Sequence, residues 1–428
     1  HDHQLHDSVR GTELALSSNK TDAEFNWDTY NSGANKGMGD FTNGGFVLDD
    51  NNNGRWNENG STFVAWNWNG GDTDGKTYTV KVHVFSGNNR YIFDDFQTQA
   101  VTLDLAEGGT YIFNMDDASN ASHPFSIGTA ANGTVYTSGI TYFLDGVSKT
   151  YSEYTSGFSG ASTRRLHITV PASAPVLYYW CSAHSGMGGQ VHTNSTLGSS
   201  NFAGSIQSTV KVNASAGFSI TAYSGNGSNT QTVGHGLGVA PDVIILKARG
   251  ASQNWRVWHK SLAADGSKRL LLDSTNASED AAFLNDTAPT STLFTLGNSD
   301  DAWNAGGGTY ITYLFSEVAG YSKFGSYIGN GNADGTFVFT GFRPAFVIIK
   351  SSSLSVDWDI ITADIPNYNV VNKYINANNS AAESTYTYLD LVSNGFKLRN
   401  TGNTLNQSGA TYIYLAFAES PFKNARAR

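Results

Sequence analysis

The most informative segment of the sequence runs Tyr178-Tyr179-Trp180-Cys181-Ser182-Ala183-His184-Ser185-Gly186-Met187-Gly188-Gly189. It contains Cys181, the only cysteine among 428 residues, followed by His184 and then by Met187. Aromatic residues before the cysteine favour a β-strand, and the glycines after it favour a turn. A thiolate, an imidazole and a thioether at this spacing can meet at one metal ion. Thiolate and thioether select copper(I), and imidazole suits both oxidation states of copper.

A second histidine would complete an electron-transfer copper site, whose ligands are two histidines, one cysteine and a weakly bound methionine. The sequence offers His123, which follows the strand-like residues 110–114. A plainer interpretation stays open. In it, Cys181 is a small buried hydrophobic residue, while His184 and Met187 fill a glycine-rich turn.

His123 together with Cys181-x-x-His184-x-x-Met187 resembles the copper site of the cupredoxins, and the tight spacing is similar to that of the amicyanins. The resemblance implies that His123, Cys181 and His184 bind copper equatorially and that Met187 binds it axially. Strand-like runs typical of a Greek-key sandwich occur at 78–85, 100–104, 109–114, 165–170 and 176–181. Between them, residues 128–162 are rich in Gly, Ser, Thr and Tyr and predict a long loop.

The composition favours an all-β chain of several domains. Charged residues make up 14% of the chain and aromatic residues 13%, and there are 46 glycines, as expected for short strands joined by tight turns. A chain of this length is expected to form more than one domain. The formal charge of −10 argues against a nucleic-acid partner, which would require a basic surface. No apolar run reaches membrane-spanning length, so no membrane partner is expected.

Three segments of the chain resemble one another. Residues 62–68 match residues 309–317 and 411–419, and each is an apolar, aromatic and β-branched run that predicts a buried strand. Upstream of each lies a polar partner containing asparagine, at residues 16–24, 272–279 and 375–383. The matches indicate a repeated β unit of domain size rather than the turn of a solenoid.

The second and third copies also share an opening. Residues 236–247 parallel 341–350, each with a proline that leads into Val-Ile-Ile and then a lysine. Ahead of these, residues 223–227 parallel 327–331. The first copy lacks such an opening. We therefore expect the chain to begin within a domain, whose earlier strands are removed, disordered or supplied by a partner.

These features predict four domains in an all-β chain of β-sandwiches. We expect an incomplete sandwich module at residues 1–72, the Greek-key cupredoxin-like domain at 73–203, and jelly-roll-like sandwich modules at 204–322 and 323–428. The repeated modules would thus flank the candidate copper domain.

The repeated unit, with its Pro-led opening and a closing strand that ends Ala416-Phe417-Ala418-Glu419, resembles a β-rich module of marine bacteriophage structural proteins, especially tail-fibre and appendage proteins. The resemblance covers nearly the whole chain. It implies a virion surface protein for assembly and host-surface attachment. Its expected partners are further copies of itself in a homo-oligomer such as a trimer, other virion proteins and host surface glycans. Two alternatives stay open: a secreted copper-binding or electron-transfer protein, and a cellular surface-layer or adhesion protein.

Other candidate sites are weaker. Residues 49–54 begin like a calcium loop, but Gly60 stands where such a loop needs a bidentate glutamate, so a turn is the preferred interpretation. Tryptophans near glycines could stack on sugars, although aromatic residues of a sandwich more often pack its core. These tryptophans are Trp255, Trp258, Trp303 and Trp358. The sequence has no nucleophile elbow, zinc-binding helix motif or phosphate loop, so we do not expect an enzyme.

Overall fold

The chain divides into two compact units. The computed structural model describes residues 1–27, 29, 37–42, 45–48, 56–71, 75–363 and 369–419. Unit 1 comprises His1–Asp7, Thr12–Asn69 and Val212–Arg428, and unit 2 comprises Ser8–Gly11 and Gly70–Lys211. The calcium-loop candidate at residues 49–54 lies outside the described residues.

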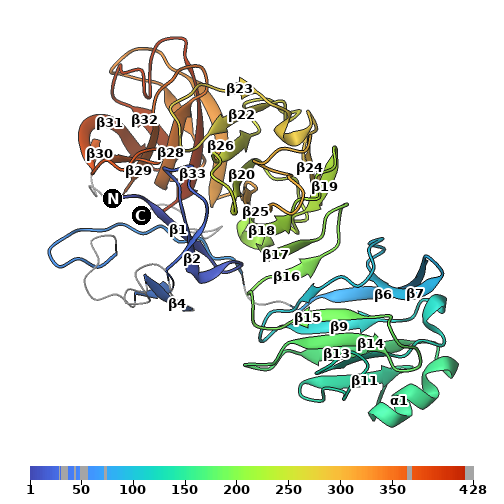
Figure 1. Cartoon of the computed structure of the whole chain (residues 1–428). Helices are drawn as coiled ribbons and strands as arrows, with labels where there is room; N and C mark the ends of the chain where they lie inside the picture. Colours follow the sequence, from blue (N-terminus) through green and yellow to red (C-terminus); the bar gives the residue numbers. More distant parts are fainter. Residues whose placement is uncertain are drawn as a thin grey trace. The chain divides into compact units, whose positions relative to one another are not determined.

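The predicted all-β fold is confirmed. Apart from short 3-10 turns, the secondary structure of the described residues consists of strands and a single α-helix, α1 (Tyr151–Gly157) (Figure 1). No helix in this part of the chain is long and apolar enough to cross a bilayer.

Unit 2 contains two sheets that share one core. The first has the order β12 (Val147–Lys149), β11 (Ile140–Leu144), β13 (Arg164–Thr169), β9 (Thr110–Asn114), β6 (Thr77–Phe85) and β7 (Asn88–Phe93). The second has the order β10 (Phe125–Gly128), β14 (Leu177–Cys181), β15 (Gly189–His192) and β8 (Leu103–Asp104). A further antiparallel pair is formed by β16 (Ser199–Asn201) and β17 (Ser208–Asn213).

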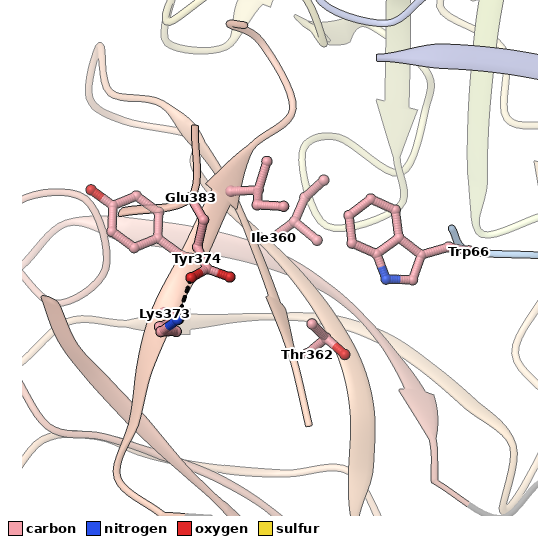
Figure 2. A pocket seen from close by; sticks show the side chains of 7 residues that line it. Trp66, Ile360, Thr362, Lys373, Tyr374 and Glu383 are labelled. Atoms are coloured by element: carbon pink, nitrogen blue, oxygen red, sulfur yellow. Dashed lines mark ion pairs between the residues drawn. The ribbon is translucent and has the colours of Figure 1, made fainter. Parts of the chain in front are cut away.

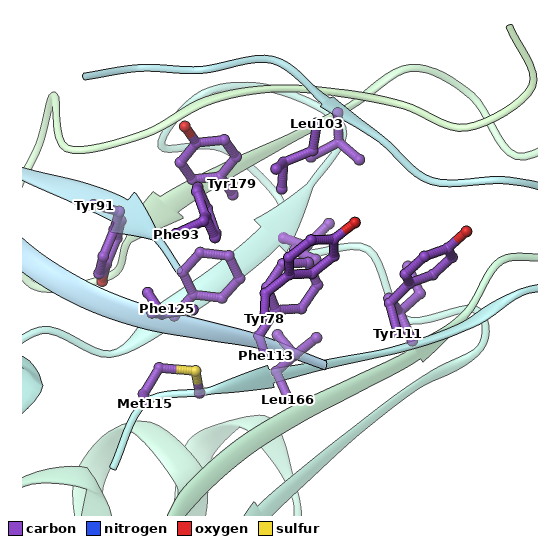
Figure 3. Close-up of a cluster of buried hydrophobic side chains, with 14 of the residues drawn as sticks. Tyr78, Tyr91, Phe93, Leu103, Tyr111, Phe113, Met115, Phe125, Leu166 and Tyr179 are labelled. Atoms are coloured by element: carbon purple, nitrogen blue, oxygen red, sulfur yellow. The ribbon is translucent and has the colours of Figure 1, made fainter. Parts of the chain in front are cut away.

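Aromatic rings from both sheets fill this core (Figure 3). Phe93 of β7 lies edge-on to Tyr179 of β14 with ring centroids 5.1 Å apart, and Phe113 of β9 stacks on Phe125 of β10 at 4.9 Å. Large rings bury much apolar surface and prefer such offset or edge-to-face contacts. Cys181 belongs to the same buried cluster, so the end of β14 is anchored in the core.

The prediction of a long loop over residues 128–162 is wrong. This stretch contains the hairpin of β11 and β12 followed by helix α1. Thr150 caps the helix by accepting from the Glu153 N–H, and the Glu153 side chain accepts from the Thr150 N–H in return. This capping box satisfies two backbone donors that would otherwise lack partners. The helix is held on the domain by Tyr154, which is buried with its ring 4.6 Å from that of Tyr142.

Unit 1 is built from repeated sheets. One runs β18 (Phe218–Ser224), β25 (Thr309–Phe315), β20 (Val243–Ala248), β21 (Arg256–His259), β22 (Lys268–Leu271) and β23 (Glu279–Asp280), with β19 (Gln231–Gly234) paired to β24 (Leu293–Leu296). The other runs β26 (Ser322–Ile328), β33 (Thr411–Ala418), β28 (Pro344–Ser351), β29 (Trp358–Thr362), β30 (Val371–Asn376), β31 (Ser384–Val392), β32 (Gly395–Leu398) and β27 (Phe337–Phe339). The N-terminal strands are β1 (Gln4–Asp7), β2 (Gly11–Ser17), β3 (Phe25–Asn26), β4 (Met38–Thr42) and β5 (Gly45–Leu48).

The sequence repeat corresponds to a repeat of structure. We call the strands β18–β25 the second module, β26–β33 the third module, and β1–β5 with residues 56–69 the first module. The closing strand is central in the second and third modules, where β25 lies between β18 and β20 and β33 lies between β26 and β28. The same cross-strand ring pair recurs, with Tyr223 on Tyr310 and Tyr327 on Tyr412, each at 5.1 Å.

The first module departs from this pattern. Residues 62–68, predicted to form a buried strand, are not assigned to any strand. Phe63 is 48% exposed and Val64 36% exposed. The prediction is wrong for the described chain because a central strand needs a neighbour on each side, and none of the described strands lies beside this segment.

Equivalent contacts join the modules to one another. Trp255 Nε1 donates to Ser17 O at 2.9 Å, and Trp358 Nε1 donates to Leu271 O at 2.8 Å. Four residues after each of these carbonyls, a second carbonyl of the same loop accepts from a buried lysine of the next module. Lys247 Nζ donates to Thr21 O and Lys350 Nζ donates to Thr275 O, each at 3.1 Å. Thus a loop of the first module rests on the second, and the matching loop of the second rests on the third.

The corresponding loop of the third module contacts the first. Ser18 Oγ donates to Ala377 O at 3.2 Å, and His3 Nε2 lies 2.9 Å from Asn379 O. All three modules are therefore connected by loops that occupy the same place in the repeat.

The four tryptophans considered for sugar stacking are buried. Their exposed fractions are 0% for Trp255, 3% for Trp258, 4% for Trp303 and 1% for Trp358. They pack the core and the contacts between modules, so no ring face among them is open to a glycan.

Candidate metal centre

Antiparallel pairing of β10 and β14 brings His123 beside the loop that follows Cys181. Phe125 is the register partner of Cys181. One step beyond this pair, the Ser182 N–H donates to Pro124 O at 3.0 Å. His123 comes directly before this ladder, so an early loop and the Cys181–Met187 loop meet at the same end of the sheet.

The two histidines approach the cysteine sulfur at nearly equal distances. Cys181 Sγ lies 3.7 Å from His123 Nδ1 and 3.6 Å from His184 Nδ1. The two imidazole ring centroids are 4.5 Å apart. The ligand atoms of these three side chains all lie within 4.8 Å of one another. They are the one such group of three or more His, Cys, Asp or Glu side chains among the described residues.

These distances fit a shared metal ion. Bonds of about 2.3 Å to sulfur and about 2.0 Å to nitrogen, meeting at roughly 110–120°, would place sulfur and nitrogen about 3.5–3.7 Å apart. A thiol has one proton and can donate to one nitrogen at a time. The simultaneous approach of both Nδ1 atoms to Cys181 Sγ is therefore explained better by a common cation than by a hydrogen bond.

One side of the site is buried and the other is exposed to solvent. Cys181 is 2% exposed and His123 is 7% exposed, whereas the His184 side chain is exposed. Burial, together with the charge of neighbouring His184, lowers the pKa of His123. A neutral imidazole keeps the lone pair that a metal ligand needs, so His123 is prepared to bind without first losing a proton.

Met187, the fourth predicted ligand, lies in the loop that follows Cys181. Its side chain is 1% exposed and belongs to the same buried cluster as Cys181. Its carbonyl accepts from the Tyr91 N–H at 3.1 Å, which ties the loop to β7. The glycines that follow are required by packing, because a Cβ on Gly188 would lie 1.6 Å from Tyr179 O. Only a residue without a side chain lets the loop turn back this tightly.

Two residues of β7 support His123 from behind, and sequence reasoning missed both. The Tyr91 hydroxyl donates to His123 O at 2.8 Å, and Nδ2 of the Asn89 side-chain amide lies 3.4 Å from His123 Nε2. A ligating histidine commonly donates its second ring N–H to a neighbouring oxygen, which fixes the ring and its tautomer, and the Asn89 amide offers one when it is turned by 180°. No sequence motif marks these residues, because the contact depends on how β7 packs beside the loop.

The other histidines of unit 2 lie apart from this group. His192 Nδ1 is 3.4 Å from Asp104 Oδ1, the His167 ring is 4.6 Å from that of Phe143, and the His83 ring is 4.8 Å from that of Phe85. Each has a local partner of its own on or beside a strand, as expected for structural residues.

These observations define a class: an all-β protein of repeated modules with an additional sandwich that carries a histidine–cysteine–histidine group. The chain belongs to the family described as Domain of unknown function (DUF7483), which it matches over residues 1–94 and 191–421. The residues between the two matched segments, 95–190, include His123, Cys181, His184 and Met187. No curated protein matches the chain.

Proposed function

We propose that unit 2 binds one copper ion through His123, Cys181 and His184, with Met187 as a weaker fourth ligand. The observation that carries this proposal is the approach of both Nδ1 atoms to Cys181 Sγ at 3.6–3.7 Å. Copper held by such a set can exchange single electrons. The protein's own contribution is to keep the Cys181 sulfur away from water and to hold His123 rigidly, while exposed His184 gives access from solvent.

The donor set favours copper over other common metals. Thiolate and thioether sulfur are soft ligands, and two imidazoles with one thiolate form the trigonal set of electron-transfer copper sites. Structural zinc sites instead use four strong donors, typically with two or more cysteines. Unit 2 has one cysteine, so a closed zinc site of that kind is not available.

The first experiment is visible absorption of the purified full chain during titration with copper(II), with Cys181→Ser as the matched variant. We expect a copper–thiolate band near roughly 600 nm that saturates at one equivalent of copper, with no such band in the variant. Because serine is close in size to cysteine, the variant should keep its fold, to be checked by its circular dichroism. Two folded proteins without the band, or with the same band, would refute the copper site.

We also propose a structural role for unit 1, as part of a virion appendage that serves assembly and host-surface attachment. The resemblance of the repeated unit to phage structural modules supports this role, as do the equivalent contacts that join the three modules. The expected partners are further copies of the chain, other virion proteins and host surface glycans, and the expected location is the virion surface. The competing candidates are a secreted electron-transfer protein and a cellular surface-layer or adhesion protein.

These candidates differ in where the protein occurs and in what it binds. Immunogold labelling of particles and binding of purified protein to host cells test the appendage role directly. Labelled particles with cell binding would support it. Protein found free in the medium or on the cell envelope, with none on particles, would contradict it.

A further inference from the structure

A hollow of about 480 Å³ opens at the surface of the third module, formed by β30, β31 and the residues that follow β32. This volume falls within the range of small-molecule binding sites, about 300–1,000 Å³. A second hollow, lined by Trp66 and by residues of the third module such as Lys373 and Glu383 (Figure 2), has a volume of about 10 Å³ and admits no more than a water molecule. Of the two, the larger hollow has room for a ligand. Its lining includes Asn372, Thr385, Tyr386, Thr387, Arg399 and Thr401.

The equivalent place in the second module is closed. The Arg399 N–H donates to Tyr388 O at 2.8 Å. At the same point of the repeat, the Gly297 N–H donates to Phe283 O at 3.2 Å, so Gly297 is the counterpart of Arg399. A Cβ on Gly297 would lie 1.8 Å from the carbonyl oxygen of Ala282, where a 3-10 turn begins. In the third module the extended strand β31 replaces this turn and leaves room for a long side chain. The repeated fold therefore does not itself require the larger hollow.

The larger hollow presents one aromatic ring to solvent. Tyr386 is 51% exposed, and its ring meets that of buried Tyr388 edge to face with centroids 5.7 Å apart. This contact supports the Tyr386 ring from the protein side. The face of an aromatic ring carries partial negative charge. It therefore attracts a ligand whose C–H groups carry partial positive charge, as those on the face of a sugar ring do.

Polar side chains around Tyr386 are free to bind a ligand. The side chains of Asn372, Thr385 and Thr387 form no hydrogen bond with any other described residue. A hydroxyl group donates and accepts hydrogen bonds, and a side-chain amide does both through separate atoms. Such groups match the hydroxyls of a sugar, each of which also donates and accepts.

Arg399 adds a donor to the hollow without adding net charge. Its Nε donates to Asp390 Oδ2 at 2.6 Å, and its Nη1 donates to Asp334 Oδ1 at 3.3 Å. Lys397 Nζ also lies 2.8 Å from Asp334 Oδ1, so two cations face two carboxylates. This balance favours neither an anionic nor a cationic ligand. Nη2 of Arg399 forms no hydrogen bond with a described residue and remains free to donate.

We infer that the larger hollow binds a neutral saccharide, with one sugar ring stacked on Tyr386 and its hydroxyls bonded to the polar side chains around it. An extended peptide fits less well, because β31 is paired with β30 on one edge and with β32 on the other and offers no free edge to a further strand. The saccharide site would give the attachment role proposed for unit 1 its class of ligand, and its biological purpose rests on that role.

The test is saturation-transfer NMR followed by calorimetric titration of the purified full chain. The probes are the neutral sugars maltose, lactose, mannobiose and chitobiose, with sialyllactose as an acidic sugar. We expect at least one neutral sugar to bind saturably at a single site. If no neutral sugar binds, or if sialyllactose binds more tightly than all of them, the inference is wrong.

Matched variants locate the site. Tyr386→Ala should weaken binding roughly tenfold through loss of the stacked ring, whereas Tyr386→Phe keeps the ring and should bind within about twofold of the parent. Thr387→Val keeps the shape of the side chain, removes its hydroxyl and should weaken binding several-fold. Phe339→Ala removes a ring of the same module that is 62% exposed and should leave binding unchanged.

Equal affinity of the parent and Tyr386→Ala, with both folded by circular dichroism, would place the sugar elsewhere and overturn the inference. The attachment role can fail separately. Sugar binding that Tyr386→Ala abolishes, by a protein that attaches to no host cell, would support the site and refute the attachment role.

Discussion

Trp68 and Phe417 hold the same position in two copies of the repeat, and their rings meet edge to face with centroids 5.5 Å apart. The pair joins the first module to the third at a point where the second module contributes Phe315. Contacts among equivalent residues of all three modules link the stability of the modules, because removing one ring affects the packing of the other two.

Replacing Trp68 with alanine should destabilise unit 1 by about 2 kcal/mol, less than for a fully buried tryptophan because its side chain is half-buried. Trp68→Phe restores the residue found in the other two modules and should cost about 1 kcal/mol or less. Urea unfolding followed by tryptophan fluorescence measures both. Equal losses for the two variants would show that the ring contact contributes little.

Replacing Asn89 with leucine should weaken copper binding roughly tenfold, as is typical when the outer partner of a ligating histidine is removed. When Nδ1 binds a metal, Nε2 of His123 carries the proton, and the Asn89 amide accepts it through its oxygen once the amide group is turned by 180°. Asn89→Asp keeps an acceptor and should bind copper at least as well as the parent. Competition titration with a copper chelator gives the affinities, and identical values for leucine and aspartate would exclude this role for Asn89.

Gly188→Ala should disrupt the Cys181–Met187 loop. The added methyl group would lie 1.6 Å from Tyr179 O, so the loop or β14 must move, at a cost of about 3 kcal/mol. Gly160→Ala, where no atom lies within 4 Å of the new methyl group, is the matched control in unit 2. Thermal unfolding should separate the two variants clearly. The same melting temperature in both would contradict the packing argument.

Acid should weaken the contact between the second and third modules. Burial lowers the pKa of His259 to about 4, and the neutral ring is fully used, since Nδ1 accepts from the Ser261 N–H while Nε2 lies 3.3 Å from Tyr414 O. Because the unfolded chain binds this proton near pH 6.5 and the folded chain does so only near pH 4, stability is complete above pH 6.5. As the pH falls from 6.5 to 4, up to about 3 kcal/mol is lost.

His259→Gln offers a donor and an acceptor that do not titrate, so its unfolding free energy should change less between pH 6.5 and 4. Buried His235, whose pKa burial also lowers, should leave a smaller dependence in the same direction. Urea unfolding at several pH values measures the difference. Parallel pH profiles for parent and variant would exclude His259 as the main acid-sensitive group.

The sequence was sufficient for the all-β character of the chain and for selecting His123, Cys181 and His184, whose donor atoms lie together. Cys181, His184 and Met187 lie on one short loop, so local spacing alone could bring them together. His123 could be found because it follows a strand and precedes another. The supporting contacts of Asn89 and Tyr91 could not be predicted from the sequence, because they arise from packing between distant segments.

Two predictions failed for identifiable reasons. The loop prediction for residues 128–162 overlooked the Thr-x-x-Glu signature at Thr150, which marks a helix start. Residues 62–68 have the composition of a buried strand. A strand is buried only where other strands lie beside it, and local sequence does not determine that.

The contacts between modules run head to tail. A loop of the first module contacts the second module, and the equivalent loop of the second contacts the third. The equivalent loop of the third module contacts the first through Ala377 and Asn379. Heterologous contacts of this kind either extend without limit or close on themselves. Here one polypeptide supplies all three subunits of a closed ring, so formation of the ring does not depend on protein concentration. Closure also engages the equivalent loop of every module inside one polypeptide.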